Sequence, residues 1–126
     1  MSSRTRLALI VVVGFGLCLV ALVYRGPGWQ PLRHTGGDVF AAALLYGLIG
    51  LAYPRWPRRG RATLAAAIAA AIEITQAFEL LSPDAPRWLH VVLGATYDPL
   101  DLLAYAVGIG LAVALDTPVC TRHSEA

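Results

Sequence analysis

The sequence predicts an all-α integral membrane protein, a single domain over residues 1–126 built as a four-transmembrane-helix bundle. Hydrophobic residues make up 57% of the chain and charged residues only 14%, whereas a soluble domain carries roughly a quarter charged residues. The charges cluster in short segments between long apolar runs, which is typical of polytopic membrane proteins. The net charge of +2 therefore does not indicate nucleic-acid binding, because the arginines stand where topology signals are expected.

The first crossing is predicted over residues 7–24, an apolar run that follows Arg4 and Arg6. A cleaved signal peptide is the rival interpretation. The run is longer than the roughly 7–15 apolar residues of a signal-peptide core, and no A-x-A-like site precedes Arg25, so we expect a retained helix. Residues 25–37 are predicted to be a loop, because glycines and prolines interrupt the helical pattern there.

A second crossing is predicted over residues 38–53 and a third over residues 62–81. They are joined by a tight basic hairpin, residues 54–61, which contains four arginines and two prolines. A fourth crossing is predicted over residues 99–115, and residues 116–126 are expected to form a polar tail. The four apolar segments account for most of the chain, which leaves no room for a second soluble domain.

The longest connection, residues 82–97, is predicted to contain a short interfacial helix. Asp84-Ala85-Pro86 is typical of a helix start and Gly94 of a helix stop. Residues 86–93 would then lie in the membrane interface, where Trp88 is a suitable anchor. The positive-inside rule places both termini in the cytoplasm, because this orientation puts seven arginines in the inner segments and three in the outer ones.

The third apolar run carries Glu73 and Gln76, and a carboxylate at membrane depth costs about 3 kcal/mol or more unless it has partners. Counting ~1.5 Å per residue from Ala62, Glu73 lies ~16 Å into the helix, near the bilayer midplane. It shares a helical face with small residues such as Ala66 and Ala69, which favour close helix packing. We therefore expect Glu73 to point into the bundle and to be a candidate functional residue.

The predicted orientation brings further polar residues to the outer half of the bundle. On the fourth helix Asp101 and Tyr105 share a face with Gly108 and Ala112, whose small side chains form a packing ridge. Asp38 and Asp98 begin the second and fourth helices at the outer side. His34, Arg87 and His90 belong to the outer loops. The candidate binding cluster consists of Glu73, Gln76, Asp101, Tyr105, Asp38, Asp98, Arg87 and His34.

Structural interpretations of these residues stay open. Asp38 and Asp98 both stand where a helix N-cap is expected, and Asp101 is placed to complement the helix dipole. Glu73 is also compatible with a buried structural hydrogen bond or with a neutral, protonated carboxyl group. Arg87 would pair with one of the carboxylates or with a lipid phosphate.

The pattern indicates no particular chemistry. The carboxylates and histidines do not follow a metal-binding spacing, so neither a metal nor another cofactor is predicted. No nucleophile elbow, P-loop or H-E-x-x-H motif is present, and whether the chain is an enzyme stays open. Cys18 and Cys120 lie far apart in the predicted topology, so we expect neither a disulfide nor a metal site from them.

Three stretches resemble a small bacterial inner-membrane family filed as domain of unknown function 2809. They are GGDV (36–39), IEITQ (72–76) and VLGATYDPLDLLAYAVG (92–108), and the resemblance covers the chain from about residue 7 to residue 115. It implies that the aspartates and the E-x-x-Q element recur in relatives, although Pro99 stands where that family commonly has an aromatic residue. The architecture is also similar, more loosely, to VanZ-like proteins, which are linked to glycopeptide resistance at the cell surface.

These observations lead to an expectation about function. An outward-facing polar cavity in a bacterial inner-membrane protein is at the right depth to bind a lipid or cell-envelope precursor headgroup. A membrane enzyme that acts on such a headgroup and a structural or assembly partner without a ligand are the alternatives. An oligomer is compatible with the sequence, and a transporter built from four helices per protomer would require one.

Overall fold

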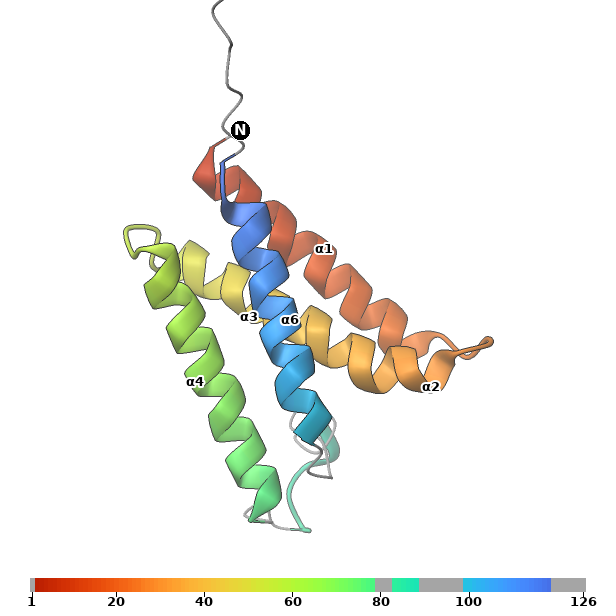
Figure 1. Cartoon of the computed structure of the whole chain (residues 1–126). Helices are drawn as coiled ribbons and strands as arrows, with labels where there is room; N and C mark the ends of the chain where they lie inside the picture. The colour runs from red at the N-terminus through yellow and green to blue at the C-terminus, as the bar shows by residue number, and fades with distance from the viewer. Residues whose placement is uncertain (1, 79–82, 89–98, 119–126) are drawn as a thin grey trace, which may run out of the picture.

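The computed structural model describes residues 2–78, 83–88 and 99–118. Every regular element in this part of the chain is helical (Figure 1), as the all-α prediction requires. The elements are α1 (Ser3–Val23), α2 (Trp29–Pro31), the π-helical turn η1 (Leu32–Gly36), α3 (Gly37–Ala52), α4 (Arg58–Ala77) and α6 (Pro99–Asp116). Four of these are long helices, and they correspond to the four predicted apolar segments.

The first helix begins earlier than the apolar run that predicted it. Ser2 is its N-cap, and the Ser2 hydroxyl accepts a hydrogen bond of 3.2 Å from the backbone N–H of Thr5. This cap satisfies one of the donors that a helix N-terminus leaves unpaired, so the polar residues before Leu7 are already helical. The helix ends at Val23, where Tyr24 adopts an extended conformation.

The predicted loop over residues 25–37 is wrong beyond Gly28. Helical structure starts at Trp29 and continues through η1 into α3, which makes one helical run of 24 residues. Gly28 has a φ of 76° and turns the chain into this run. Pro31 lies in the first turn, where its missing N–H is not needed, and Gly36 keeps a helical φ of −63°. A helical glycine costs only about 1 kcal/mol, which packing outweighs.

The third long helix is displaced toward the N-terminus relative to the prediction of residues 62–81. It begins at Arg58, directly after Pro57, because arginine is a good helix former and continues the helix as readily as alanine. It ends at Ala77, with Phe78 as the C-cap residue. The basic hairpin is correspondingly short, and the rings of Tyr53 and Trp56 stack across it with centroids 4.7 Å apart.

The predicted interfacial helix falls largely outside the described residues. Arg87 and Trp88 are helical, as the predicted interfacial helix over residues 86–93 requires, but residues 89–93 are not described. The predicted fourth crossing begins at Pro99 as expected. It extends one residue further than predicted, because Asp116 is its last helical residue rather than the start of a polar tail.

The central helix of the bundle is α3, which packs against α1, α4 and α6. The helices α3 and α6 approach each other closely at Gly108. A Cβ atom on Gly108 would overlap the backbone carbonyl oxygen of Val39 and would lie 3.0 Å from the Cβ of Ala42. The predicted small-residue ridge of Gly108 and Ala112 therefore faces α3 and lets the two helices meet backbone to backbone.

Buried residues recur every four positions on both α4 and α6. On α4 they are Arg61, Ala65, Ala69 and Glu73, so the buried stripe includes Ala69 as predicted, while the predicted Ala66 is exposed. On α6 they include Ala104, Gly108, Ala112 and Asp116, whereas Leu103, Val107 and Leu111 are exposed, as predicted. The two stripes face the rest of the bundle, and each has charged residues near its ends.

The surface of the molecule is strongly apolar. The helix α1 and the run from Trp29 to Ala52 are both long and apolar enough to cross a membrane. Only 22% and 28% of their most apolar windows are buried within the fold, whereas the core helix of a soluble protein is mostly buried. Large apolar side chains such as Val12 and Val23 are exposed, which is the surface expected of a protein surrounded by lipid.

Candidate functional site

Polar side chains from α3, α4 and α6 meet around the hydroxyl group of Tyr105. Glu73 of α4, Asp38 of α3 and Asp101 of α6 all lie close enough to this hydroxyl to act on it electrostatically. Glu73 is only 3% exposed. The structure thus brings together four residues that the sequence placed in the candidate cluster, and we call Glu73, Tyr105, Asp38 and Asp101 the carboxylate cluster.

The positions of these residues follow from local helical geometry. Asp101 and Tyr105 are four residues apart on α6 and therefore lie on one face. Glu73 continues the buried alanine stripe of α4, which turns it away from the surroundings and toward α6. Asp38 is the second residue of α3, directly after the π-helical turn and inside the continuous helical run from Trp29 to Ala52, and Gly36 is the residue that precedes α3. The N-cap interpretation of Asp38 is therefore wrong.

Gln76 lies one turn beyond Glu73 on α4. Its side chain is half-buried, and its Oε1 atom is buried without a hydrogen-bond partner in the described part of the chain. A buried carbonyl oxygen that accepts no hydrogen bond costs about 1–3 kcal/mol. This oxygen is therefore available to a donor from a bound molecule.

The other predicted members are not part of this buried group. His34 lies exposed in η1, and Arg87 is exposed in the segment 83–88. Asp98 lies outside the described residues, so neither its predicted role as an N-cap nor its role in the cluster is decided. Together with the amide of Gln76, the three carboxylates and the phenol of the carboxylate cluster give an excess of hydrogen-bond acceptors, which suits a hydroxyl or ammonium group.

Within the described residues, no three histidine, cysteine, aspartate or glutamate side chains come together closely enough to hold a metal ion. Cys18 is a free thiol, half-buried in α1, and Cys120 is not described.

Comparison with protein families identifies the chain. A family model described as "Protein of unknown function (DUF2809)" matches residues 27–109. The chain belongs to the DUF2809 family. The DUF2809 match runs from the turn before α2 into α6 and covers all four residues of the carboxylate cluster together with Gln76. The predicted resemblance to this family is confirmed, and the looser similarity to VanZ-like proteins stays a prediction.

Searches of curated proteins and of solved structures found no match. The DUF2809 match leaves out the whole of α1 and the last turns of α6. Arg6 and Asp116, which lie outside the match, belong to a second polar group that the sequence did not predict.

This second group is built around Asp116 at the C-terminal end of α6, and its side chain is fully buried. Its Oδ2 atom accepts hydrogen bonds from the Tyr46 hydroxyl at 2.8 Å and from Nη1 of Arg61 at 2.9 Å. Two further arginines contribute charge, since Nε of Arg58 lies 3.6 Å from Oδ2 and Nε of Arg6 lies 3.9 Å from Oδ1. We call these five residues the arginine–aspartate cluster.

The backbone takes part in the same network. The carbonyl oxygen of Asp116 accepts a hydrogen bond from Nε of Arg6 at 3.1 Å and another from Nε of Arg58 at 3.2 Å. Nη2 of Arg61 donates to the carbonyl oxygen of Pro54 at 2.8 Å. Positive side chains near a helix C-terminus complement its partial negative charge, so these contacts join the start of α1, the hairpin and the end of α6.

One signal in the sequence pointed to Asp116. It continues the spacing of four that runs through Gly108 and Ala112 on the buried face of α6, just as Arg61 precedes Ala65 and Ala69 on α4. Because Asp116 directly follows the apolar run, hydropathy predicts it to be the first residue of the polar tail. The structure shows that it is instead the last residue of α6.

Proposed function

We propose that this DUF2809 member is a four-span protein of the bacterial inner membrane whose carboxylate cluster binds a lipid or cell-envelope precursor headgroup. The observation that carries the proposal is the burial of the Glu73 side chain beside Tyr105, with Asp38 and Asp101 of two other helices near the same tyrosine. Carboxylates at membrane depth are costly. Their grouping at one place is explained most simply by a ligand that donates hydrogen bonds to them.

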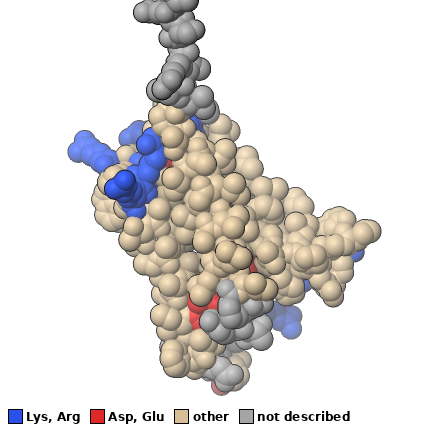
Figure 2. Space-filling model, in the orientation of Figure 1, with Lys and Arg blue, Asp and Glu red and all other residues tan. Residues whose placement is uncertain are grey.

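The direction of the helices supports the four-span arrangement. The contacts of Arg6, Pro54 and Asp116 bring the start of α1, the α3–α4 hairpin and the end of α6 to one end of the bundle, so consecutive long helices run in opposite directions (Figure 1). Figure 2 shows the largest group of basic side chains at this end, smaller ones at the lower right, and acidic atoms toward the opposite end of α4 and α6. By the positive-inside rule this end is cytoplasmic, and the carboxylate cluster lies in the outer half.

The acceptor-rich composition of the cluster narrows the class of ligand. A bare phosphate would be repelled by three carboxylates, whereas a sugar hydroxyl or a primary ammonium group would donate to them and to Oε1 of Gln76. Lipids and envelope precursors carry such groups at this depth. The ligand that fits is therefore a headgroup rich in hydroxyl groups or bearing an amine.

Mass spectrometry of the lipids that co-purify with the full-length protein tests the proposal. Wild-type protein should retain a lipid or lipid-linked precursor with such a headgroup. Glu73→Gln and Asp101→Asn should each reduce retention about tenfold, since a charge-assisted hydrogen bond contributes ~1.5–3 kcal/mol. Asp84→Asn, in the exposed segment 83–88, is the matched control and should retain the same lipid as wild type.

Two other results would contradict the proposal and favour an alternative. If all variants retain the same lipids while Glu73→Gln and Asp101→Asn lose thermal stability, the cluster serves as a structural or assembly element. If the variants bind the headgroup normally but stop its conversion to a product by the purified protein, the cluster belongs to an enzyme that acts on that headgroup.

A further inference from the structure

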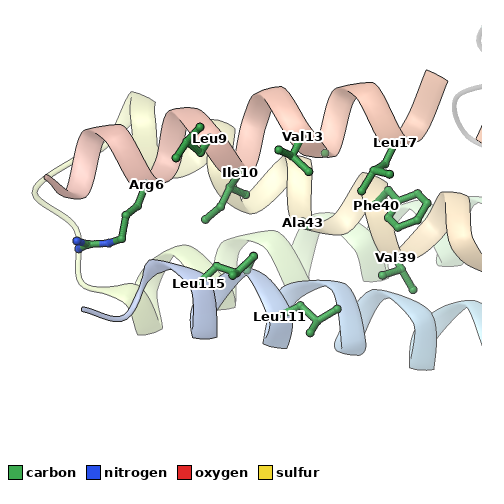
Figure 3. Close-up of a pocket in the computed structure, with 12 residues that line it drawn as sticks. Arg6, Leu9, Ile10, Val13, Leu17, Val39, Phe40, Ala43, Leu111 and Leu115 are labelled. Atoms are coloured by element: carbon green, nitrogen blue, oxygen red, sulfur yellow. The ribbon is translucent and has the colours of Figure 1, made fainter. Parts of the chain in front are cut away.

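An apolar groove of about 420 Å³ runs between α1 and α6, with α3 as its floor (Figure 3). Its walls are aliphatic and aromatic side chains such as Val13 and Leu17 of α1, Phe40 of α3 and Leu111 of α6. The groove is distinct from the carboxylate cluster, which lies between α3, α4 and α6. Arg6 lies at one end of the groove, as Figure 3 shows, and it is the charged residue that lines it.

The length of the groove corresponds to one leaflet of a bilayer. Along α1 it extends from Arg6 to Leu17, eleven residues that rise ~16 Å in an α-helix. Half of the ~30 Å hydrocarbon core of a bilayer is ~15 Å. The groove has this length, apolar walls and a cation at one end. It is therefore complementary in shape and polarity to one acyl chain with an anionic headgroup.

The charge at the Arg6 end supplies the second argument. Arg6 and Arg58 both donate through Nε to the carbonyl oxygen of Asp116, so their guanidinium groups lie next to each other. Six arginines lie within residues 2–6 and 54–61. The arginine–aspartate cluster, by comparison, contains one carboxylate, that of Asp116. Among these, the Arg58 side chain is 41% exposed and accessible from the surface, whereas that of Arg6 is only 14% exposed and lines the groove.

We propose that this groove binds an acyl chain of an anionic phospholipid whose phosphate is held by Arg6 and Arg58. Two adjacent guanidinium groups offer a phosphate several donors in a planar arrangement, and basic residues at a membrane surface favour anionic lipids. A second copy of the chain is a poorer occupant of the groove. Inserted in the same orientation, it would bring another set of arginines to the same end, where like charges repel.

Equilibrium binding to the full-length protein in detergent, followed by native mass spectrometry, tests the inference with phosphatidylglycerol and phosphatidylcholine of identical acyl chains. Wild type should bind phosphatidylglycerol at least about tenfold more tightly than phosphatidylcholine. Ala43→Phe fills the groove without changing an arginine, whereas Ala41→Phe places the same ring on an exposed position of α3. Ala43→Phe should weaken phosphatidylglycerol binding about tenfold and Ala41→Phe less than about twofold.

The headgroup contact is tested by Arg6→Gln against Arg4→Gln, since Arg4 is exposed. Arg6→Gln should remove most of the preference for phosphatidylglycerol, and Arg4→Gln should preserve it. Equal binding by Ala43→Phe and Ala41→Phe would overturn the proposal even if Arg6→Gln fails to fold. Competition by inorganic phosphate at the concentration of the lipid would also overturn it, and so would a wild-type dimer that Ala43→Phe converts to a monomer.

Discussion

The hydroxyl group of Tyr46, in the middle of the chain, donates a 2.8 Å hydrogen bond to the carboxylate of Asp116 at the end of α6. Both side chains are fully buried. The contact joins the central helix to the last one, and Arg61 joins α4 to the same oxygen atom. Three helices are therefore held together by one carboxylate, which makes the stability of the bundle depend on it.

Replacing this carboxylate is predicted to be strongly destabilising. Asp116→Asn keeps the shape of the side chain but leaves the buried Arg61 and its neighbours without a counter-charge, and breaking a buried ion pair costs about 3–5 kcal/mol. Tyr46→Phe removes one hydrogen bond to a charged group and should cost about 2 kcal/mol. Unfolding of the detergent-solubilised protein, followed by circular dichroism, measures both effects.

Tyr53→Phe is the control for the tyrosine substitution, because Tyr53 is exposed at the hairpin. Its free energy of unfolding should stay within about 0.5 kcal/mol of wild type, as is usual for surface substitutions. A Tyr46→Phe protein as stable as Tyr53→Phe would show that the hydrogen bond to Asp116 contributes nothing.

Enlarging Gly108 is predicted to separate α3 from α6. A valine at this position would meet the backbone of Val39, which cannot move aside as a flexible side chain would. Overpacking of this kind typically costs about 1–3 kcal/mol. Gly110→Val, on the same helix with no atom within 4 Å of its added Cβ, should be tolerated, and thermal unfolding of the two variants should separate them clearly.

Gln76→Met distinguishes binding from structure at the carboxylate cluster. Methionine has a similar length but no polar oxygen, so it removes a buried carbonyl oxygen that has no partner within the described residues. We expect the free energy of unfolding to rise by about 1 kcal/mol, because an unsatisfied buried group is removed, and retention of the headgroup ligand to fall. A loss of stability instead would mean that Oε1 forms a structural hydrogen bond.

Topology reporters test the proposed orientation. With both termini in the cytoplasm, a fluorescent protein fused after Ala126 should fluoresce, and alkaline phosphatase fused after residue 58 should be inactive. Phosphatase inserted at Pro27, between α1 and α2, should be active, because that turn would lie outside. Activity of the fusion after residue 58 would contradict the arrangement, since the arginine-rich hairpin would then face outward.

Much of the arrangement was predictable from helical spacing alone. The alanine stripe of α4 correctly predicted that Glu73 faces inward, because a desolvated carboxylate must follow the face that packs. The same reasoning placed Asp101 and Tyr105 on the packed face of α6. Antiparallel consecutive helices then bring the start of α3, which carries Asp38, to the same end of the bundle as these side chains.

The errors have physical causes of their own. Glycine and proline between Arg25 and Gly37 were interpreted as helix breakers, but their cost is small beside the packing of a continuous helix. Asp116 was assigned to a tail because hydropathy alone ends the helix at the last apolar residue. Its burial depends on three arginines from distant parts of the chain, and no local pattern reports such a partnership.

Gly108 also has a consequence for chemistry. Gly108 lies one helical turn from Tyr105 on α6, and Val39, the residue that it contacts on α3, directly follows Asp38. The absence of one side chain thus sets how near the Asp38 carboxylate can come to the Tyr105 phenol. The distance between the two side chains is thus limited by a residue that has no functional group. A relative with a bulkier residue at this position would have to bring the acidic residues together in another way.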